Sequence, residues 1–362
     1  MTSLLTDRVL GGLLGAALGD AVGGPVEGLD AAEIVARHGR VTGPLAYDRE
    51  VGDHGPWTLH AGSWTDDTRM SLLVVDAVLA SGGDVTAGDL GAVLVAAHAA
   101  ARDDLEGGFL EEYALKALHG RRKLIFGGHP TNGAVMGNVA LGLLHPCDPD
   151  AAFATAYDLA FVTDGYAKES AAIAAAVVAG AMASGSSARE VVEEALQVAL
   201  AFRREGELWP RTVATQQWAR FEGLPNHLLV YGALEVLDAY GGDLAAATPA
   251  LYERLHVSPL GSESGQTLAV ALTAFVAADG DPRETVLGAV AYGRDCDSYA
   301  AVAGGIAGAQ AGAEALPRDW VATVLAANDG DALLSRGASL AALVEQRHAV
   351  RRSVMARVDA LL

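Results

Sequence analysis

Apolar positions repeat along most of this chain with the spacing of an α-helix. Near the C-terminus, Leu340, Leu343 and Val344 lie three or one positions apart, and polar residues follow them, as expected when one helix face is buried. Similar segments are bounded by Gly, Pro or a capping Asp, Ser or Thr. They predict helices over residues 6–22, 30–38, 66–81, 86–102, 108–119, 132–144, 149–162, 167–184, 187–203, 226–240, 265–278, 282–292, 296–313 and 337–361. Alternating patterns typical of strands are hard to find, so the sequence predicts an all-α fold.

Two stretches interrupt the helical pattern. Residues 41–64 contain Pro44 and Pro56 among glycines and aspartates, and they predict a long loop. Residues 205–225, which carry Trp209 and Trp218, are also irregular. Loops of this length inside a compact domain are usually functional. Since no low-complexity linker or short repeat divides the chain, we expect a single compact domain over residues 1–362.

Two of the predicted helices are crowded with glycine, at residues 11–19 and 300–309. Glycine inside a helix costs about 1 kcal/mol relative to alanine. Its recurrence therefore predicts that these two helices approach neighbours closely, at the centre of the bundle. Alanine-rich bulk alone would explain the alanines but not the glycines.

Composition narrows the possible partners. Hydrophobic residues make up 51% and charged residues 19% of the 362 residues, which is enough for a sizeable core. The formal net charge of -20 argues against nucleic acid or an anionic membrane as a partner, because phosphate binding needs clustered Lys and Arg. A small anionic substrate remains compatible where a metal supplies the positive charge.

Cysteine usage and hydropathy favour a cytoplasmic protein. The two cysteines, Cys147 and Cys296, show neither disulfide nor zinc-ligand spacing, which fits a reducing compartment. The apolar N-terminus is interrupted by Asp20 and lacks a cleavage site, so we do not expect it to be a signal peptide. The longest uninterrupted apolar run, residues 171–183, is too short for a membrane span of about 20 residues.

Acidic residues cluster at two predicted helix starts about 230 residues apart. Thr65, Asp66 and Asp67 precede one apolar run. Asp295, Asp297 and Ser298 precede another. Each alone is typical of a well-capped helix. Together they are two halves of a possible oxygen-ligand site, and an all-oxygen set favours Mg²⁺, Mn²⁺ or Ca²⁺ over Zn²⁺.

Further polar positions are ambiguous on their own. Glu27 follows Pro25 and would ordinarily be a surface residue, while Asp20 could be a buried cap. Residues 127–133 precede a predicted helix, where backbone N–H groups could hold a phosphate. A turn with an Asn132 or Thr131 cap is the commoner explanation of such a segment, and His129 is most simply an ordinary loop histidine.

Four stretches together resemble the ADP-ribosylglycohydrolase family. They are residues 12–27, 64–68, 131–136 and 295–304, spread in family order over most of the chain. The resemblance implies an all-α orthogonal helical bundle with a binuclear Mg²⁺ or Mn²⁺ centre. It also implies a glycosidase that cleaves bonds to ribose.

The resemblance also assigns roles to individual residues. Thr65, Asp66 and Asp67 would bind the first cation, Asp297 would bridge the pair, and Asp295 and Ser298 would bind the second. Glu27 would act beside the metals as a ligand or acid/base group, with Asp66 and Asp297 also counted as catalytic. Substrate contacts would come from Gly128, Thr131, Asn132, Gly133 and Asp164.

Departures from the family pattern keep alternatives open. Ser298 stands where Thr is usual, Arg294 where Gly is usual, and Asp164 where His is usual; an Arg usually found after the Met136 element is missing. The first hypothesis is a metal-dependent hydrolase of an N- or O-glycosidic bond to ribose in an ADP-ribose conjugate, either small or protein-linked. The alternatives are a hydrolase of a free nucleoside or ribosylated metabolite, and a catalytically silent, crystallin-like binding protein. The oligomeric state is not predicted.

Overall fold

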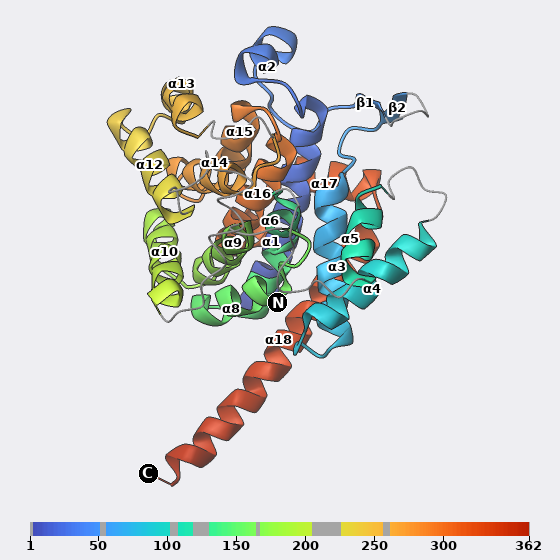
Figure 1. The fold of residues 1–362 in the computed structure, drawn as a ribbon, viewed down its shortest axis with the longest axis vertical. Helices are drawn as coiled ribbons and strands as arrows, with labels where there is room; N and C mark the ends of the chain where they lie inside the picture. The colour runs from blue at the N-terminus through green and yellow to red at the C-terminus, as the bar shows by residue number, and fades with distance from the viewer. Residues whose placement is uncertain are drawn as a thin grey trace.

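The computed structural model describes residues 3–50, 56–101, 108–118, 130–163, 167–204, 226–255 and 261–361, which are mostly helical with almost no strands (Figure 1). This confirms the all-α prediction. The helices are α1 (Leu4–Gly23), α2 (Ala31–His38), α3 (Asp66–Ala80), α4 (Ala87–Ala100), α5 (Gly108–Leu118), α6 (Gly133–Gly137), α7 (Val139–Leu144), α8 (Pro149–Leu159), α9 (Ala167–Ala181), α10 (Ala188–Arg204), α12 (Asn226–Ala239), α13 (Leu244–Leu255), α14 (Ser264–Ala277), α15 (Pro282–Tyr292), α16 (Cys296–Ala311), α17 (Arg318–Ala327) and α18 (Gly330–Asp359). Short 3₁₀ turns occupy Gly24–Val26 and Ala313–Ala315. The predicted irregular stretch 205–225 lies outside the described residues.

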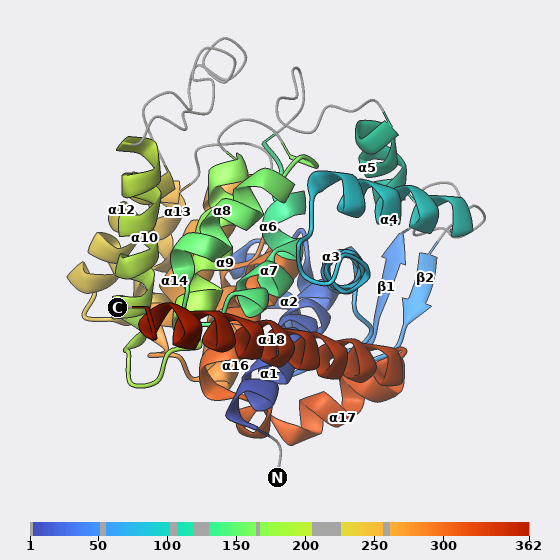
Figure 2. The ribbon, with the colours of Figure 1, turned by 90° about the horizontal axis from the view of Figure 1, so that it is seen from below.

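Helices α1 and α16 form the centre of the molecule and pack against each other in opposite directions (Figures 1 and 2). The contact is made by Gly11 against Gly308, Gly15 against Gly304, and Gly19 against Ala300. A Cβ atom at any of these α1 glycines would overlap a backbone oxygen of α16. The predicted close approach is therefore confirmed, and it explains why glycine is kept despite its cost in a helix.

The last glycine of α1 sets the position of the metal-ligand candidates. A Cβ at Gly23 would overlap the backbone of Asp297, at the first turn of α16. Because the two helices touch there, the segment after α1 and the start of α16 must lie at the same end of the core. The glycine spacing thus determines the packing, and the packing determines which acids meet.

By length and hydropathy, Leu4–Val26 could cross a membrane, and it is the one such helix among the described residues. Its most apolar window is 89% buried inside the protein. Helix α1 is therefore explained as the core helix of the bundle.

Several predicted boundaries were wrong. The predicted loop 41–64 contains an antiparallel hairpin of β1 (Tyr47–Glu50) and β2 (Pro56–Leu59). The predicted helix 132–144 is divided at Asn138 into α6 and α7. The last helix begins at Gly330 and not at residue 337, because Asp329 caps it by accepting from Ala332 N at 3.0 Å.

Two helices were not predicted at all. Helix α13 contains Pro249, a residue that ordinarily ends a helix. Its first turn is nevertheless capped by Asp243, which accepts from Ala246 N at 3.0 Å. Helix α17 buries Trp320 and Val324, with Val321 and Leu325 packed against the core, so its helical apolar spacing was overlooked.

Candidate metal centre

A cavity of about 580 Å³ lies where the segment after α1 meets the starts of α3 and α16. Its walls include most of the predicted site residues: Glu27, Asp66, Asp67, Thr131, Asn132, Asp295, Asp297 and Ser298. Residues about 230 positions apart in sequence are therefore brought into one site. Thr65 is buried directly before Asp66 and is not among the residues that line this cavity.

The start of α3 is held by a carboxylate from another helix. Asp20 of α1 is fully buried and accepts hydrogen bonds from the backbone N–H groups of Thr65 and Thr68, at 2.9 and 3.0 Å. It also accepts from both threonine hydroxyls, at 2.8 and 2.5 Å. The Thr65 hydroxyl itself caps no N–H group. The helix start is capped as expected, but the capping side chain is Asp20 and not the Thr65 hydroxyl, so the suggestion that Asp20 is a buried cap is confirmed.

The start of α16 is held by backbone pairing with the segment that carries Glu27. Gly28 N donates to Arg294 O at 2.6 Å, and Arg294 N donates to Leu29 O at 2.5 Å. This pairing needs positive φ at Gly28, Gly293 and Arg294, with values of 82°, 80° and 64°. Two of the three positions are glycine, which adopts this conformation without steric cost.

As a result, Glu27 meets the acids of α16. One carboxylate oxygen each from Glu27, Asp295 and Asp297 lies within 4.8 Å of the others. The structure therefore places Glu27 at the candidate site, where the sequence alone favoured an ordinary surface position.

Hydrogen bonds tie the two helix starts together. Burial raises the pKa values of Asp67 and Asp295, and side-chain hydrogen bonding with Ser298 opposes the rise at both acids, so Ser298 contacts an acid from each helix start. Asn132 Nδ2 donates to Asp295 Oδ2 at 2.5 Å and to Thr267 Oγ1 at 3.1 Å. Asn132 thus orients a candidate ligand, and its predicted substrate contact stays a prediction.

The electrostatics of the cluster favour a bound cation. Burial raises the pKa of Asp295 to about 7, and the neighbouring Glu27 carboxylate adds to the shift. Burial raises the pKa values of Asp67 and Asp297 well above their ordinary range, and the charges of Asp20 and Glu27, respectively, add to it. Buried carboxylates that repel one another are stabilised either by protons or by a metal ion.

The donor set fits a hard divalent cation. Asp67 Oδ1 is buried and accepts no hydrogen bond from the residues that the structure describes. The Thr65 hydroxyl gives its proton to Asp20, which leaves its oxygen lone pairs available as acceptors. The Cys296 thiol points elsewhere and donates to Gly23 O at 3.6 Å. The available ligands are therefore all oxygens, as Mg²⁺ and Mn²⁺ prefer.

The predicted substrate residues have mixed positions. Thr131 and Asn132 line the cavity, whereas Gly133 does not; the Tyr113 hydroxyl lies directly against Gly133, where a Cβ would overlap it. Gly128 and Asp164 fall outside the described residues, as does most of the proposed phosphate loop. Thr163, next to Asp164, donates through Oγ1 to Thr131 O at 2.5 Å and so helps to hold the cavity wall.

Other cavity residues were missed by the sequence reasoning. Helix α5 contributes Glu112 and Tyr113, and the segment before α14 contributes Gly261 and Ser262. Burial and the charge of Asp66 raise the pKa of Tyr113, so its phenol stays protonated and can donate a hydrogen bond. Nothing in the local pattern around these residues separates them from an ordinary amphipathic helix and a loop.

Comparisons with known proteins identify the family of this chain. The ADP-ribosylglycohydrolase family model matches residues 1–353. A solved structure described as an ADP-ribosylglycohydrolase-related protein complex is similar, with a TM-score of 0.58 and 25% sequence identity over 94% of this chain and 99% of that chain. A search of curated proteins found no match.

Proposed function

The chain belongs to the ADP-ribosylglycohydrolase family, and from this premise we propose a specific activity: metal-dependent hydrolysis of the N- or O-glycosidic bond between ribose and its leaving group in an ADP-ribose conjugate. The observation that carries the proposal is the shared cavity of Glu27, Asp66, Asp67, Asp295 and Asp297. Carboxylates gathered in this way need positive charge, and a ribose diol offers oxygen atoms that can share the same cations.

The cavity residues divide into two ligand groups. Thr65, Asp66 and Asp67 would hold one Mg²⁺ or Mn²⁺, and Asp295 and Ser298 would hold a second. Asp297 is buried, and the charges of Glu27 and Asp67 both act on it, so it would serve as a ligand of both cations. When bound, the cations would supply positive charge that orients the ribose cis-diol and acidifies a water molecule.

Glu27 is the group best placed for proton transfer. Unlike Asp67 and Asp297, it comes from a loop, so its carboxylate can face both the acids and the open cavity. It would take a proton from water as the water oxygen bonds to C1′ of ribose. The bond from C1′ to the leaving nitrogen or oxygen breaks, the leaving atom takes up a proton from the solvent, and Glu27 returns its proton to the solvent. Asp66 and Asp297 would stabilise the positive charge that develops on the ribose.

The decisive experiment measures both metal binding and turnover. Protein stripped with a chelator is titrated with Mg²⁺ or Mn²⁺ by calorimetry, and release of ADP-ribose from N-linked and O-linked conjugates is then measured at each occupancy. We expect release to follow metal occupancy, and Asp297→Ala to lose both. Metal binding without release of ADP-ribose would contradict the proposed activity, while turnover that is unchanged after full chelation would contradict the metal dependence.

A panel of substrates addresses the alternative of a smaller ribosylated compound. Hydrolysis of a free nucleoside or ribosylated metabolite at a higher kcat/KM than any ADP-ribose conjugate would favour that alternative. The departures at Asp164 and after Met136 motivate the panel, and ADP-ribosyl-arginine in protein is the conjugate expected to react most weakly.

A further inference from the structure

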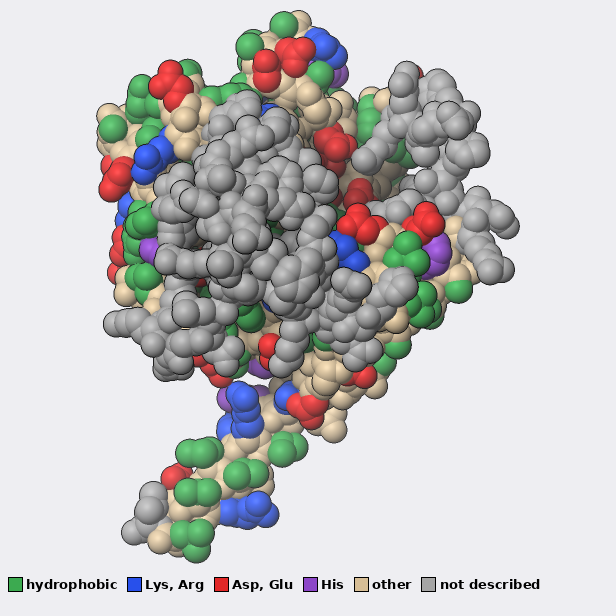
Figure 3. Space-filling model, viewed as in Figure 1, with side chains coloured by type: hydrophobic (Ala, Val, Ile, Leu, Met, Phe, Trp, Pro, Cys, Tyr) green, Lys and Arg blue, Asp and Glu red, His purple; other side chains and the backbone are tan. Residues whose placement is uncertain are grey.

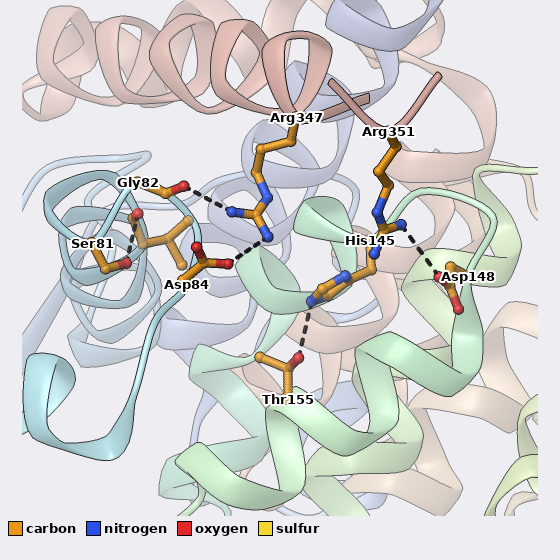
Figure 4. A network of polar contacts seen from close by, with 9 residues as sticks. Ser81, Gly82, Asp84, His145, Asp148, Thr155, Arg347 and Arg351 are labelled. Carbon is orange, nitrogen blue, oxygen red and sulfur yellow. Dashed lines mark hydrogen bonds and ion pairs between the residues drawn. The ribbon is translucent and has the colours of Figure 1, made fainter. Parts of the chain in front are cut away.

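Nearly all of the described arginine and lysine side chains are at least partly exposed, and Figure 3 shows several of them on the outer end of α18. Some fasten one part of the protein to another (Figure 4). Arg347 pairs with Asp84 at 2.8 Å, and Arg351 reaches Asp148 at 3.7 Å. The positions of these two arginines are explained by the fold. Arg294 has a different position, because it lines the metal cavity.

Arg294 is the one Lys or Arg among the described residues that line this cavity. Six carboxylates share the wall with it, those of Glu27, Asp66, Asp67, Glu112, Asp295 and Asp297. With Arg294 in place, burial still raises the pKa of Asp297 well above its ordinary range, and the charges of neighbouring acids add to the rise. Arg294 therefore does not neutralise the acids, and a role as their counter-ion does not account for it.

The charge of Arg294 lies near a group of tyrosines at one side of the cavity. Burial raises the pKa values of Tyr252, Tyr292 and Tyr299, and the positive charge of Arg294 opposes the rise at all three. Tyr299 in turn donates its hydroxyl to Gly261 O at 2.9 Å, and Gly261 belongs to the cavity wall. The guanidinium is therefore near the part of the wall that is formed by the segment before α14.

The backbone conformation at Arg294 indicates that its side chain has a purpose. Its φ of 64° lies in the left-handed region, which costs free energy for a residue with a Cβ. Gly28 and Gly293 take part in the same backbone pairing with φ values of 82° and 80°, and they avoid this cost. Glycine at position 294 would keep the pairing more cheaply, so the pairing does not explain an arginine there.

The chemistry of the proposed substrate does explain it. Under the proposed function, on which this inference rests, the cations hold the ribose diol. The phosphate groups of ADP-ribose are attached on the 5′ side of that ribose, in a cavity lined by acids that repel them. A phosphate group there needs a positive charge within reach. A guanidinium also presents parallel N–H donors that match two phosphate oxygens.

We propose that Arg294 binds a phosphate group of the substrate and so makes the cavity select phosphorylated ribosyl compounds over neutral nucleosides. In this role Arg294 is a binding residue and takes no part in bond breaking. Its loss should weaken the binding of phosphorylated ligands and leave neutral ligands nearly unaffected. An arginine that served only to balance the acids would affect both kinds of ligand alike.

The test measures ligand binding without turnover. Protein saturated with Mg²⁺ is titrated by calorimetry with ADP-ribose, ribose 5-phosphate and ribose at one ionic strength. Wild type should bind both phosphorylated ligands more tightly than ribose. Arg294→Gln should weaken the phosphorylated ligands by about 10–100-fold, the range of a charge-assisted hydrogen bond, and ribose by less than about twofold. Arg294→Lys should recover part of the loss, because it restores the charge but not the two parallel donors.

Two control variants separate the side chain from the fold and from overall charge. Arg294→Gly removes the side chain, and glycine adopts the same backbone conformation without strain. Its Tm and Mg²⁺ affinity should therefore not fall, while its binding of phosphorylated ligands falls as in Arg294→Gln. Arg40→Gln removes a positive charge outside the metal cavity, where Arg40 pairs with Glu284 at 3.4 Å, and should leave all three affinities unchanged.

The outcomes also separate this assignment from the proposed activity. Wild-type affinity for ADP-ribose in Arg294→Gln would overturn the assignment and leave the phosphates to other groups, such as the predicted loop 127–133. An equal loss for ribose would also overturn it, as would wild type that binds ribose 5-phosphate no more tightly than ribose. If phosphate binding depends on Arg294 but no ADP-ribose conjugate is hydrolysed, the assignment stands and the proposed activity fails.

Discussion

The two helix starts that face the metal cavity are held in place by different physical means. The start of α3 depends on a buried charge, because Asp20 accepts from two N–H groups and two hydroxyls there. The start of α16 depends on backbone shape, because its preceding loop pairs with the Glu27 segment and α1 packs against it through glycine. The α3 half should therefore respond to charge and pH, and the α16 half to added side-chain volume.

The same difference separates the proposed metal ligands Asp66 and Asp67 from Glu27, the proposed proton-transfer group. Asp66 and Asp67 belong to the half fixed by Asp20, in the regular first turn of a helix. Glu27 belongs to the loop that pairs with the α16 start, outside any helix, and faces the shared cavity. A loop carboxylate can change its contacts with the substrate, whereas a helix-start carboxylate is fixed by the helix.

The largest expected effect comes from placing one substitution in each half. Glu27→Gln keeps size and hydrogen bonding but removes basicity, so kcat should fall by about 10²–10⁴-fold, the usual contribution of a general acid or base. Metal affinity should change little. Asp66→Asn should instead weaken metal binding. Calorimetric metal titration and turnover are measured on both variants. If the Glu27→Gln variant keeps wild-type turnover, Glu27 has a structural role. If the variant loses the metal, Glu27 is a metal ligand.

The next effect tests the shape-dependent half. Gly23→Ala adds a Cβ that overlaps the Asp297 backbone, which neither helix can relieve by rotating a side chain. We expect destabilisation of about 3 kcal/mol, at the upper end for overpacked cores, measured by urea unfolding. Gly180→Ala in α9 is the matched control, because its Cβ meets a side chain of Val191 at 3.3 Å and no backbone. Equal stability of the two variants would show that the α1–α16 contact can relax.

Local patterns were sufficient for the regular helices and for the acidic pairs. Two acidic groups indicate a helix start whatever their role: Thr65, Asp66 and Asp67, and then Asp295, Asp297 and Ser298. The sequence also shows directly that their side chains offer only oxygen atoms as metal ligands. The glycines of α1 and α16 also predicted a close central contact, because glycine weakens a helix and is tolerated repeatedly where a neighbour leaves no room for a Cβ. The single domain stays a prediction.

Features that depend on distant contacts could not be read in this way. The cap of α3 is Asp20, which lies 45 positions before Thr65, so no local rule could assign it. Tyr113 and Glu112 sit in an ordinary amphipathic helix, and only packing brings them to the cavity. Pro249 inside α13 was misleading because capping and packing outweigh its missing N–H.

A smaller effect tests the charge-dependent half. Asp20→Asn keeps the shape but replaces one acceptor oxygen by a donor that faces Thr65 or Thr68. We expect a loss of about 2 kcal/mol of stability at pH 7, within the range for a broken buried hydrogen-bond network, and weaker metal binding. Asp281→Asn is the control, since Asp281 caps α15 at the surface and Asn caps equally well. Similar losses for both would mean that Asp20 is an ordinary cap.

The smallest expected effect is a pH trend that the two halves share but that a cation should remove. Burial raises the pKa of Asp20 to about 6 and that of Asp295 to about 7, from 3.8 in both cases. A raised folded-state pKa means that the folded protein holds the proton more tightly, so this contribution is full below pH 3.8 and is lost as pH rises through 6 and 7. In chelator, Tm should therefore fall between pH 5 and 8 by about 2 °C or more.

Saturating Mg²⁺ should flatten the trend, because the cation replaces the protons near Asp295. Subtracting the two curves cancels groups outside the cavity, such as His145, whose lowered pKa acts in the opposite direction. Asp20→Asn should remove the part near pH 6 only. Parallel curves with and without Mg²⁺ would mean that the cavity acids are not neutralised by the metal, and the comparison of the two halves would then rest on packing alone.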